Sequence, residues 1–175
     1  MPRSSMTGRL RVSLAIAAIM LCGLASAQDH PAQDPPGMKN WFGDPFFQLT
    51  HEIDSCPQPL GPYMSEAEAL RYSHHRAERG TRCYQEKRCR LPSSYDYDRE
   101  IAARIQGDAA EKRLPLPRST LWVLVQGRRV WIQGCVAPGY RRGALSAKLK
   151  GIPDVELAME EVRIGASGAI PYRTR

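Results

Sequence analysis

The chain has 175 residues, a net charge of +7, 42% hydrophobic residues and five cysteines. Three arginines and no acidic residue fall in the first 27 positions, so the remainder carries a charge of +4. A charge of that size suits either a mild preference for anionic surfaces or ordinary solubility, and it selects no partner. No segment after the N-terminal region is apolar enough to be predicted as a membrane helix.

The first 27 residues have the order of a secretory signal peptide. A positive region precedes a short apolar stretch at 12–24 and the small residues of 25–27. That stretch is shorter than the roughly 20 apolar residues that span a bilayer. Cys22 raises the alternative of a lipoprotein, but Leu21 stands where a lipid-attachment motif has Gly or Ala. We therefore expect cleavage after Ala27 and a periplasmic mature protein, for which nucleic acid is not an expected partner.

Four cysteines remain after that cleavage, namely Cys56, Cys83, Cys89 and Cys135. An even number in an oxidising compartment indicates two disulfide bonds, and three pairings are possible. Structural zinc is the poorer alternative, because the spacing from Cys83 to Cys89 is wider than the close cysteine pairs of zinc sites. The sequence predicts two disulfides and leaves their connectivity open.

Residues 28–40 are polar and rich in proline, so we expect a flexible leader there. Residues 41–96 lack the periodicity of a domain that folds alone, and we expect an extension that the disulfides stabilise. It begins with four aromatic residues between Trp41 and Leu49. Such a cluster either packs on its own domain, which is the favoured interpretation, or marks a contact surface.

A capping box at Ser65 and Glu68 predicts a helix that runs to about Arg79 and ends at Gly80. Its apolar residues are sparse, so we expect the helix to lie outside any core. Much of its surface is charged through Arg71, Arg76, Glu78 and Arg79. Residues 83–92 should then form a basic loop that its cysteines close.

The pattern changes after Tyr97. Residues 98–106 predict a short amphipathic helix, with Ile101 and Ile105 four residues apart. Residues 121–136 predict two strands joined by a tight turn at Gly127-Arg128. Pairing around that turn places one set of residues on a buried face: Leu121, Val123, Val125, Val130 and Ile132. The other face carries Trp122, Leu124, Trp131, Gln133 and Cys135.

Two further elements complete the expected order helix, strand, strand, helix, strand. A helix is predicted across 140–150 and a strand across 155–164. The residues expected to face the core are Ala144, Leu145 and Leu149 in the helix and Ala158, Val162 and Ile164 in the strand.

These residues carry a family resemblance. The hairpin reads VLVQGRRVWIQGCV over 123–136, with glycines at 127 and 134, and it is followed by Ala144-Leu145, by the turn at 152–155 and by the strand residues 162–164. The types of these residues and their spacing are similar to those of the BON (bacterial OsmY and nodulation) domain. The resemblance covers residues 97–166. Asp154 departs from the pattern, since the family usually has glycine there.

The resemblance implies an α/β (α+β) fold of order α-β-β-α-β, with both helices on one face of a three-stranded mixed sheet. It leaves the other face open, so we expect the 41–96 extension to cover that face, and residues 167–175 to form a tail. A disulfide to Cys135 would hold the extension in place. On this hypothesis the partner of Cys135 is Cys56 or Cys89. We favour Cys56–Cys135 together with Cys83–Cys89, because a short loop closes most readily.

No motif for catalysis stands out. His74-His75 lies on an expected exposed helix, where adjacent residues point in different directions, and residues 51–54 are explained as well by a polar turn as by ligands. Glycine-rich phosphate motifs and Ser-Asp-His arrangements are absent from the sequence. Gly127 and Gly134 are expected to serve turn and strand geometry. We therefore expect no enzyme activity, no cofactor and no metal.

The family resemblance implies binding to phospholipid or another envelope surface, in proteins that maintain the cell envelope under osmotic or other stress. The candidate residues for an anionic surface are Arg128, Arg129, Arg141, Arg142, Lys148 and Lys150. Hairpin tips and helix ends commonly carry Arg and Lys for solubility alone, so this assignment is a hypothesis. The alternative function is a protein-interaction module or a subunit of a periplasmic or secretion assembly.

Overall fold

The computed structural model describes residues 1, 34–165 and 167–175. The expected signal peptide apart from Met1, its cleavage site, Cys22 and the first part of the expected leader lie outside these residues. Residues 34–165 and 167–175 belong to one compact unit.

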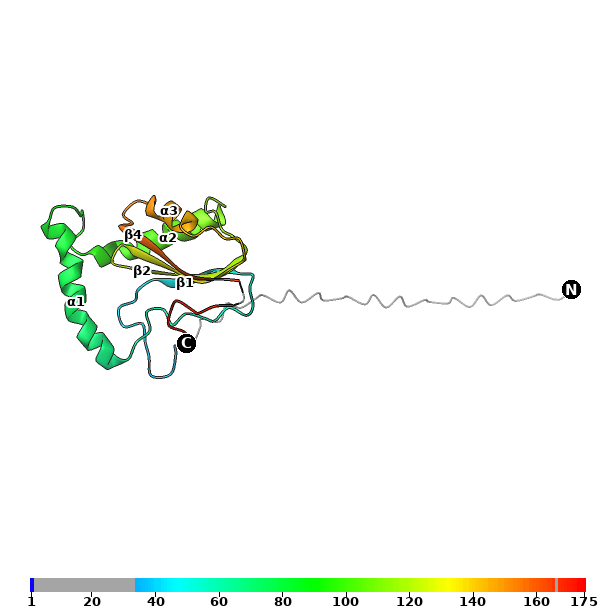
Figure 1. The fold of residues 1–175 in the computed structure, drawn as a ribbon, viewed down its shortest axis with the longest axis horizontal. Coiled ribbons are helices and arrows are strands. Elements are labelled where there is room, and N and C mark those ends of the chain that lie inside the picture. Colours follow the sequence, from blue (N-terminus) through cyan, green and yellow to red (C-terminus); the bar gives the residue numbers. More distant parts are fainter. Residues whose placement is uncertain (2–33, 166) are drawn as a thin grey trace. The chain divides into compact units, whose positions relative to one another are not determined.

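A four-stranded mixed sheet forms the centre of this unit, with the strands in the order β1-β2-β3-β4 (Figure 1). Its members are β1 (Phe46–His51), β2 (Ser119–Gln126), β3 (Arg129–Val136) and β4 (Leu157–Ile164). The pairs β1–β2 and β2–β3 are antiparallel, and β3–β4 is parallel. The mixed α+β class is therefore confirmed, whereas the expectation of three strands is wrong because β1 adds a fourth.

The extra strand comes from the aromatic segment of the extension. Phe47 and Leu49 are partly buried against the core, and the amide of Val125 donates to the carbonyl of Pro45 at 2.9 Å. The segment thus packs on its own domain, as favoured from the sequence, and it does so by adding an edge strand beside β2.

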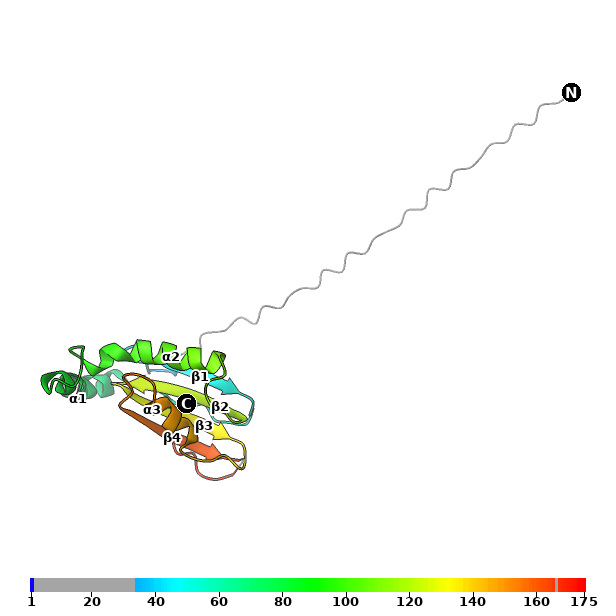
Figure 2. The same cartoon turned by 90° about the horizontal axis from the view of Figure 1, so that it is seen from above.

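Three α-helices and one 3₁₀ turn accompany the sheet: α1 (Glu66–Gln85), η1 (Ser94–Tyr97), α2 (Asp98–Ala110) and α3 (Ala144–Lys150). Helices α2 and α3 cover the same face of the sheet (Figures 1 and 2). The order α2-β2-β3-α3-β4 is the order expected from the sequence, although α2 extends beyond its expected end at Gln106.

Helix α3 is shorter than expected, because Gly143 has a left-handed conformation (φ 89°) immediately before it. Its inward residues are Leu145 and Leu149, both buried, whereas Ala144 is exposed and the expectation that it faces the core is wrong. In β4, Val162 is buried and its expected core neighbours are partly buried.

The hairpin between β2 and β3 has the predicted register. Val125 is opposite Val130, and Val123 is opposite Ile132. Gly127 (φ 61°) and Arg128 (φ 65°) are both left-handed, as a two-residue type I′ turn requires.

Gly134, in contrast, is not in a turn but inside β3. Its φ is 138°, and a Cβ there would lie 2.1 Å from the carbonyl oxygen of Thr120, so only glycine allows the two strands to approach this closely. Asp154 has φ 68°, which is the left-handed conformation that glycine adopts most readily. Aspartate tolerates this conformation better than most residues.

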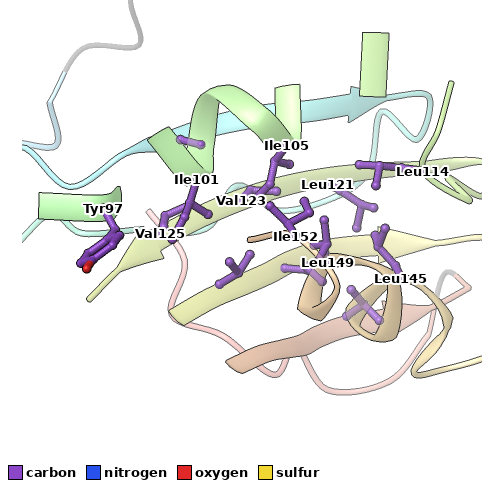
Figure 3. Close-up of a cluster of buried hydrophobic side chains, with 14 of the residues drawn as sticks. Tyr97, Ile101, Ile105, Leu114, Leu121, Val123, Val125, Leu145, Leu149 and Ile152 are labelled. Atoms are coloured by element: carbon purple, nitrogen blue, oxygen red, sulfur yellow. The ribbon is translucent and has the colours of Figure 1, made fainter. Parts of the chain in front are cut away.

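The core lies between the sheet and helices α2 and α3 (Figure 3). The five β2 and β3 residues predicted to share a buried face have no exposed surface. Helix α2 adds Ile101 and Ile105, and α3 adds Leu145 and Leu149. Burial of such side chains contributes about 1.5–3 kcal/mol each, which makes this layer the main source of stability.

Helix α1 begins at the predicted capping box, in which Ser65 Oγ accepts from the amide of Glu68 and Glu68 accepts from the amide of Ser65. It does not end at Gly80 but continues to Gln85. Gly80 is buried, and a Cβ there would lie 3.0 Å from Ser93 Oγ and 3.2 Å from the ring of Tyr95. This glycine therefore allows close packing of α1 on η1 and does not terminate the helix.

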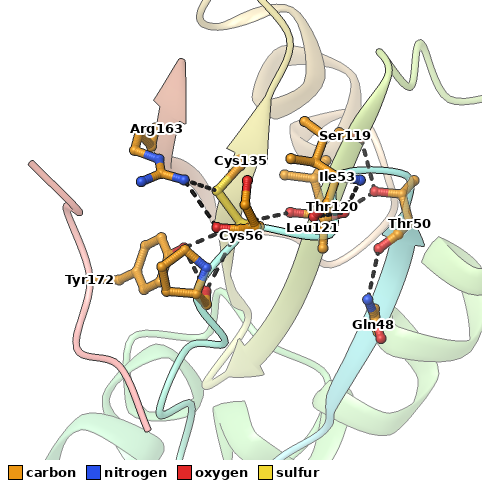
Figure 4. The surroundings of a disulfide bond; sticks show 12 residues. Gln48, Thr50, Ile53, Cys56, Ser119, Thr120, Leu121, Cys135, Arg163 and Tyr172 are labelled. Atoms are coloured by element: carbon orange, nitrogen blue, oxygen red, sulfur yellow. Dashed lines mark hydrogen bonds between the residues drawn. A yellow bond between two sulfur atoms is a disulfide. The ribbon is translucent and has the colours of Figure 1, made fainter. Parts of the chain in front are cut away.

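The second face of the sheet carries the loop of residues 52–64 and the C-terminal tail (Figure 1). A disulfide joins Cys56 in that loop to Cys135 in β3 (Figure 4). The Tyr172 hydroxyl donates to the carbonyl of Pro57 at 2.8 Å, so the tail is bonded to the same loop. The second disulfide joins Cys83, near the end of α1, to Cys89. The favoured pairing of the cysteines is thus confirmed.

The two disulfides should differ in their contribution to stability, because they close loops of 79 and 6 residues. Chain-entropy arguments give about 4.5 kcal/mol for the long loop and about 2.2 kcal/mol for the short one. We expect chemical denaturation to show a larger loss for Cys56→Ser/Cys135→Ser than for Cys83→Ser/Cys89→Ser. Equal losses, or a larger loss for the short loop, would contradict the role assigned to the long one.

Candidate functional site

A buried ion pair attaches α1 to the rest of the domain. Arg76 in α1 donates two hydrogen bonds of 2.8 Å to the two carboxylate oxygens of Asp44. The side chains are 10% and 3% exposed, respectively. Such bidentate pairs are geometrically specific, and removing one partner leaves an uncompensated buried charge. The expectation that Arg76 belongs to the charged outer surface of the helix is therefore wrong.

Aromatic rings and an amide complete the surroundings of this pair. The Arg76 guanidinium lies 3.7 Å from the centroid of the Tyr95 ring and 4.3 Å from that of Phe42. Gln126, at the end of β2, donates to Asp44 at 2.6 Å and accepts from Tyr72 of α1 at 3.0 Å. These contacts fix α1 beside the end of the sheet where the β2–β3 hairpin turns.

A second carboxylate holds the hairpin turn itself. Asp98, at the start of α2, accepts from the amides of Gly127 (2.6 Å) and Arg128 (2.8 Å). Asp98 is 2% exposed. Burial raises the pKa of Asp98 to about 6, against the opposing effect of these two hydrogen bonds.

Arg128 points back toward the domain. Its Nε donates to the carbonyl of Asp154 at 2.8 Å, and another guanidinium nitrogen lies 2.7 Å from Cys89 Sγ. Its guanidinium also lies 5.2 Å from the centroid of the Tyr97 ring. This arginine thus connects the hairpin turn to the loop before β4 and to the cysteine loop.

Between α1 and the hairpin turn lies an open groove of about 540 Å³, which we call the tip groove. Its charged lining consists of four arginines and three glutamates: Arg79, Arg82, Arg88, Arg129, Glu78, Glu86 and Glu156. The remaining lining residues are His75, Cys83, Ser94 and Gly127.

Two of these arginines share one carboxylate partner. Arg82 and Arg88 both hydrogen-bond to Glu86, and these bonds, that from Arg88 first, hold the pKa of the Glu86 carboxyl below its usual value. The side chains of Arg79 and Arg129, by contrast, make no hydrogen bond or ion pair with any residue that the structure describes. The tip groove therefore has two cations available to a ligand.

The lining of the tip groove includes a buried polar side chain as well. Ser94 is 4% exposed, and its Oγ has no hydrogen-bond partner in the described part of the chain. Buried hydroxyls nearly always have a partner, so an unpaired one calls for an explanation. Two unpaired guanidinium groups and a hydroxyl in the lining of one groove are suitable donors for a phosphate or carboxylate.

The other predicted anion-binding residues are divided between the two ends of the sheet. Arg129 is at the start of β3, whereas Arg141 and Arg142 follow its end; a strand of this length spans about 26 Å. One guanidinium nitrogen of Arg142 donates to the carbonyl of Val162 at 2.8 Å. Lys148 and Lys150 are exposed near the end of α3. The six residues thus do not form a single patch.

Sequence reasoning missed Asp44, Arg76, Ser94 and Asp98. Asp98 precedes an amphipathic pattern, where an acidic residue is ordinary at a helix start, and nothing local links it to a turn about 30 residues later. The four share no motif, because three separate segments bring them together.

Within 34–165 and 167–175, no three side chains of the types His, Cys, Asp and Glu are grouped so as to hold a metal ion. None of the helices in this part of the chain combines the length and apolar content needed to cross a membrane. No protein-family model, curated protein or solved structure was found to match the chain.

The raised pKa of Asp98 predicts a pH dependence of stability. The folded protein binds this proton more tightly than the unfolded chain, whose carboxyl has a pKa near 3.8. The contribution of Asp98 to the free energy of unfolding is therefore fully present below pH 4 and is lost as the pH rises through 6. The whole change amounts to about 3 kcal/mol.

We expect Asp98→Asn to flatten the stability curve between pH 4 and 7 by an amount of this order. Urea denaturation of both proteins at several pH values measures this difference. The other carboxyls titrate equally in the two proteins, so the comparison isolates Asp98. Parallel curves for the two proteins would show that Asp98 keeps an ordinary pKa.

Proposed function

We propose that this protein is an exported, non-catalytic binding module of the BON type that attaches to anionic phospholipid at the surface of the cell envelope, with a role in maintaining the envelope under stress. The observation that carries the proposal is the tip groove, whose lining includes Arg79, Arg129 and Ser94, the last with a buried hydroxyl that lacks a partner among the described residues. A phosphate group of a lipid would accept from all three.

The fold supports the BON assignment through its order α2-β2-β3-α3-β4 and through the left-handed conformation of Asp154, at the position where that family usually has glycine. The two disulfides support export, because disulfides persist in oxidising compartments. The additional strand β1 and helix α1 would be elaborations specific to this chain, and α1 supplies one wall of the proposed site.

The structure narrows the set of residues to test. Arg128 is engaged in contacts within the domain, and Arg141 and Arg142 lie at the far end of β3, so Arg129 is the hairpin residue best placed to meet a headgroup. Arg79, which was not among the anion-binding residues selected from the sequence, would act with it. Lys148 and Lys150 remain candidates for long-range attraction to the same surface.

The test is co-sedimentation with vesicles of phosphatidylglycerol or phosphatidylcholine at low and physiological salt. We expect binding that is selective for phosphatidylglycerol and weakens with salt. Arg79→Gln/Arg129→Gln should reduce the affinity by about 2 kcal/mol, or about thirty-fold. Ser94→Ala should also reduce it, without a change in net charge.

A matched control is Arg118→Gln/Arg141→Gln, which removes the same charge from exposed residues at the opposite end of the sheet. Its affinity should stay close to that of the unmodified protein. Equal losses of affinity in both double variants would show that the protein binds by nonspecific charge attraction and not through the tip groove. Absence of binding to either vesicle would favour the alternative function, a protein-interaction module or assembly subunit.

A further inference from the structure

The outward face of α1 carries a regular seam of exposed residues. Ala67, Leu70, His74, Ala77, Thr81 and Tyr84 are all exposed and follow one another at intervals of three and four residues. We call these six residues the outer seam. Leu70 is 66% exposed and Tyr84 is 49% exposed. Alternating spacings of three and four place side chains in a line along one helix face, as in the contact line of a coiled coil.

The domain itself does not use this face. The buried residues of α1 are Ala69, Gly80 and Cys83, and Arg76 is nearly buried on the same side. The helix has 20 residues and is therefore about 30 Å long, so the outer seam offers a long, narrow and partly apolar surface to another helix.

Two opposite charges flank the outer seam on one side. Arg71 and Glu78 are both exposed, and neither forms an ion pair with any residue in the described part of the chain. They are seven residues apart, about 10 Å along the helix axis, and so they are too distant to pair with each other. A partner helix that pairs with both residues must place an acidic residue opposite Arg71 and a basic residue opposite Glu78, with the same separation between them.

A second copy of the same helix, running antiparallel, offers this arrangement. In that alignment Leu70 of one copy lies opposite Thr81 of the other, Ala67 opposite Tyr84, and His74 opposite Ala77. Arg71 of each copy then lies opposite Glu78 of the other. A twofold axis makes both ion pairs identical, as expected for an isologous contact.

We propose that the outer seam is a self-association surface, on which two copies of this chain pack through antiparallel α1 helices with two reciprocal Arg71–Glu78 pairs. This association does not depend on the anion binding proposed for the tip groove, although Glu78 lies in the lining of that groove as well. Where both occur, one dimer would present two tip grooves to the same surface and gain affinity through bivalency.

The test is sedimentation equilibrium of the exported, disulfide-bonded protein over the micromolar to millimolar range, without lipid. We expect a monomer–dimer equilibrium. Arg71→Glu and Glu78→Arg should each place like charges opposite one another twice per dimer and weaken the dimer by about tenfold or more. The double variant Arg71→Glu/Glu78→Arg restores opposite charges and should recover the dimer.

Arg141→Glu is the matched control, since it makes the same charge change on an exposed residue outside α1 and should leave the dimer intact. Circular dichroism and thermal unfolding verify that each variant folds. A protein that stays monomeric throughout overturns the proposal. So does a dimer that the single charge reversals leave unchanged, or one that the double reversal does not recover.

Discussion

The buried pair between Arg76 and Asp44 is the interaction on which the rest of this arrangement depends. A guanidinium group is expensive to bury, and it is tolerated here because a bidentate carboxylate and the rings of Tyr95 and Phe42 surround it. Loss of either partner would leave an unpaired charge at a cost of about 3–5 kcal/mol. The pair determines where α1 lies, and with it the wall of the tip groove and the direction in which the outer seam faces.

The extension before η1 is part of the domain in a physical sense. It contributes β1 to the sheet, Asp44 to the ion pair, and Cys56 to the disulfide with β3. A core made from one sheet and two short helices is small, and small domains bury a low fraction of their surface. The disulfide of the long loop and the hydrogen bond from the tail to residue 57 compensate for this, because they hold segments against the second face of the sheet.

Local patterns were sufficient to predict the elements of residues 97–166. Alternating valines and the Gly127-Arg128 turn determined the hairpin register, and the capping box placed the start of α1. What local patterns could not provide was contact over long separations. Strand β1 is the short stretch FFQLTH, and nothing in its own residues identifies β2, about 70 positions later, as its partner strand. Arg76 was indistinguishable from its exposed arginine neighbours, and Gly80 has the appearance of a terminator until η1 is placed against it.

In the proposed function, α1 and the hairpin turn together form the surface that meets anionic lipid. Hydrogen–deuterium exchange of the protein with and without phosphatidylglycerol vesicles can test this, because it locates the contact without altering any residue. We expect slower exchange in residues 75–88 and 127–130 and unchanged exchange in residues 138–143. Protection confined to residues 138–143, with α1 and the hairpin turn unaffected, would contradict it.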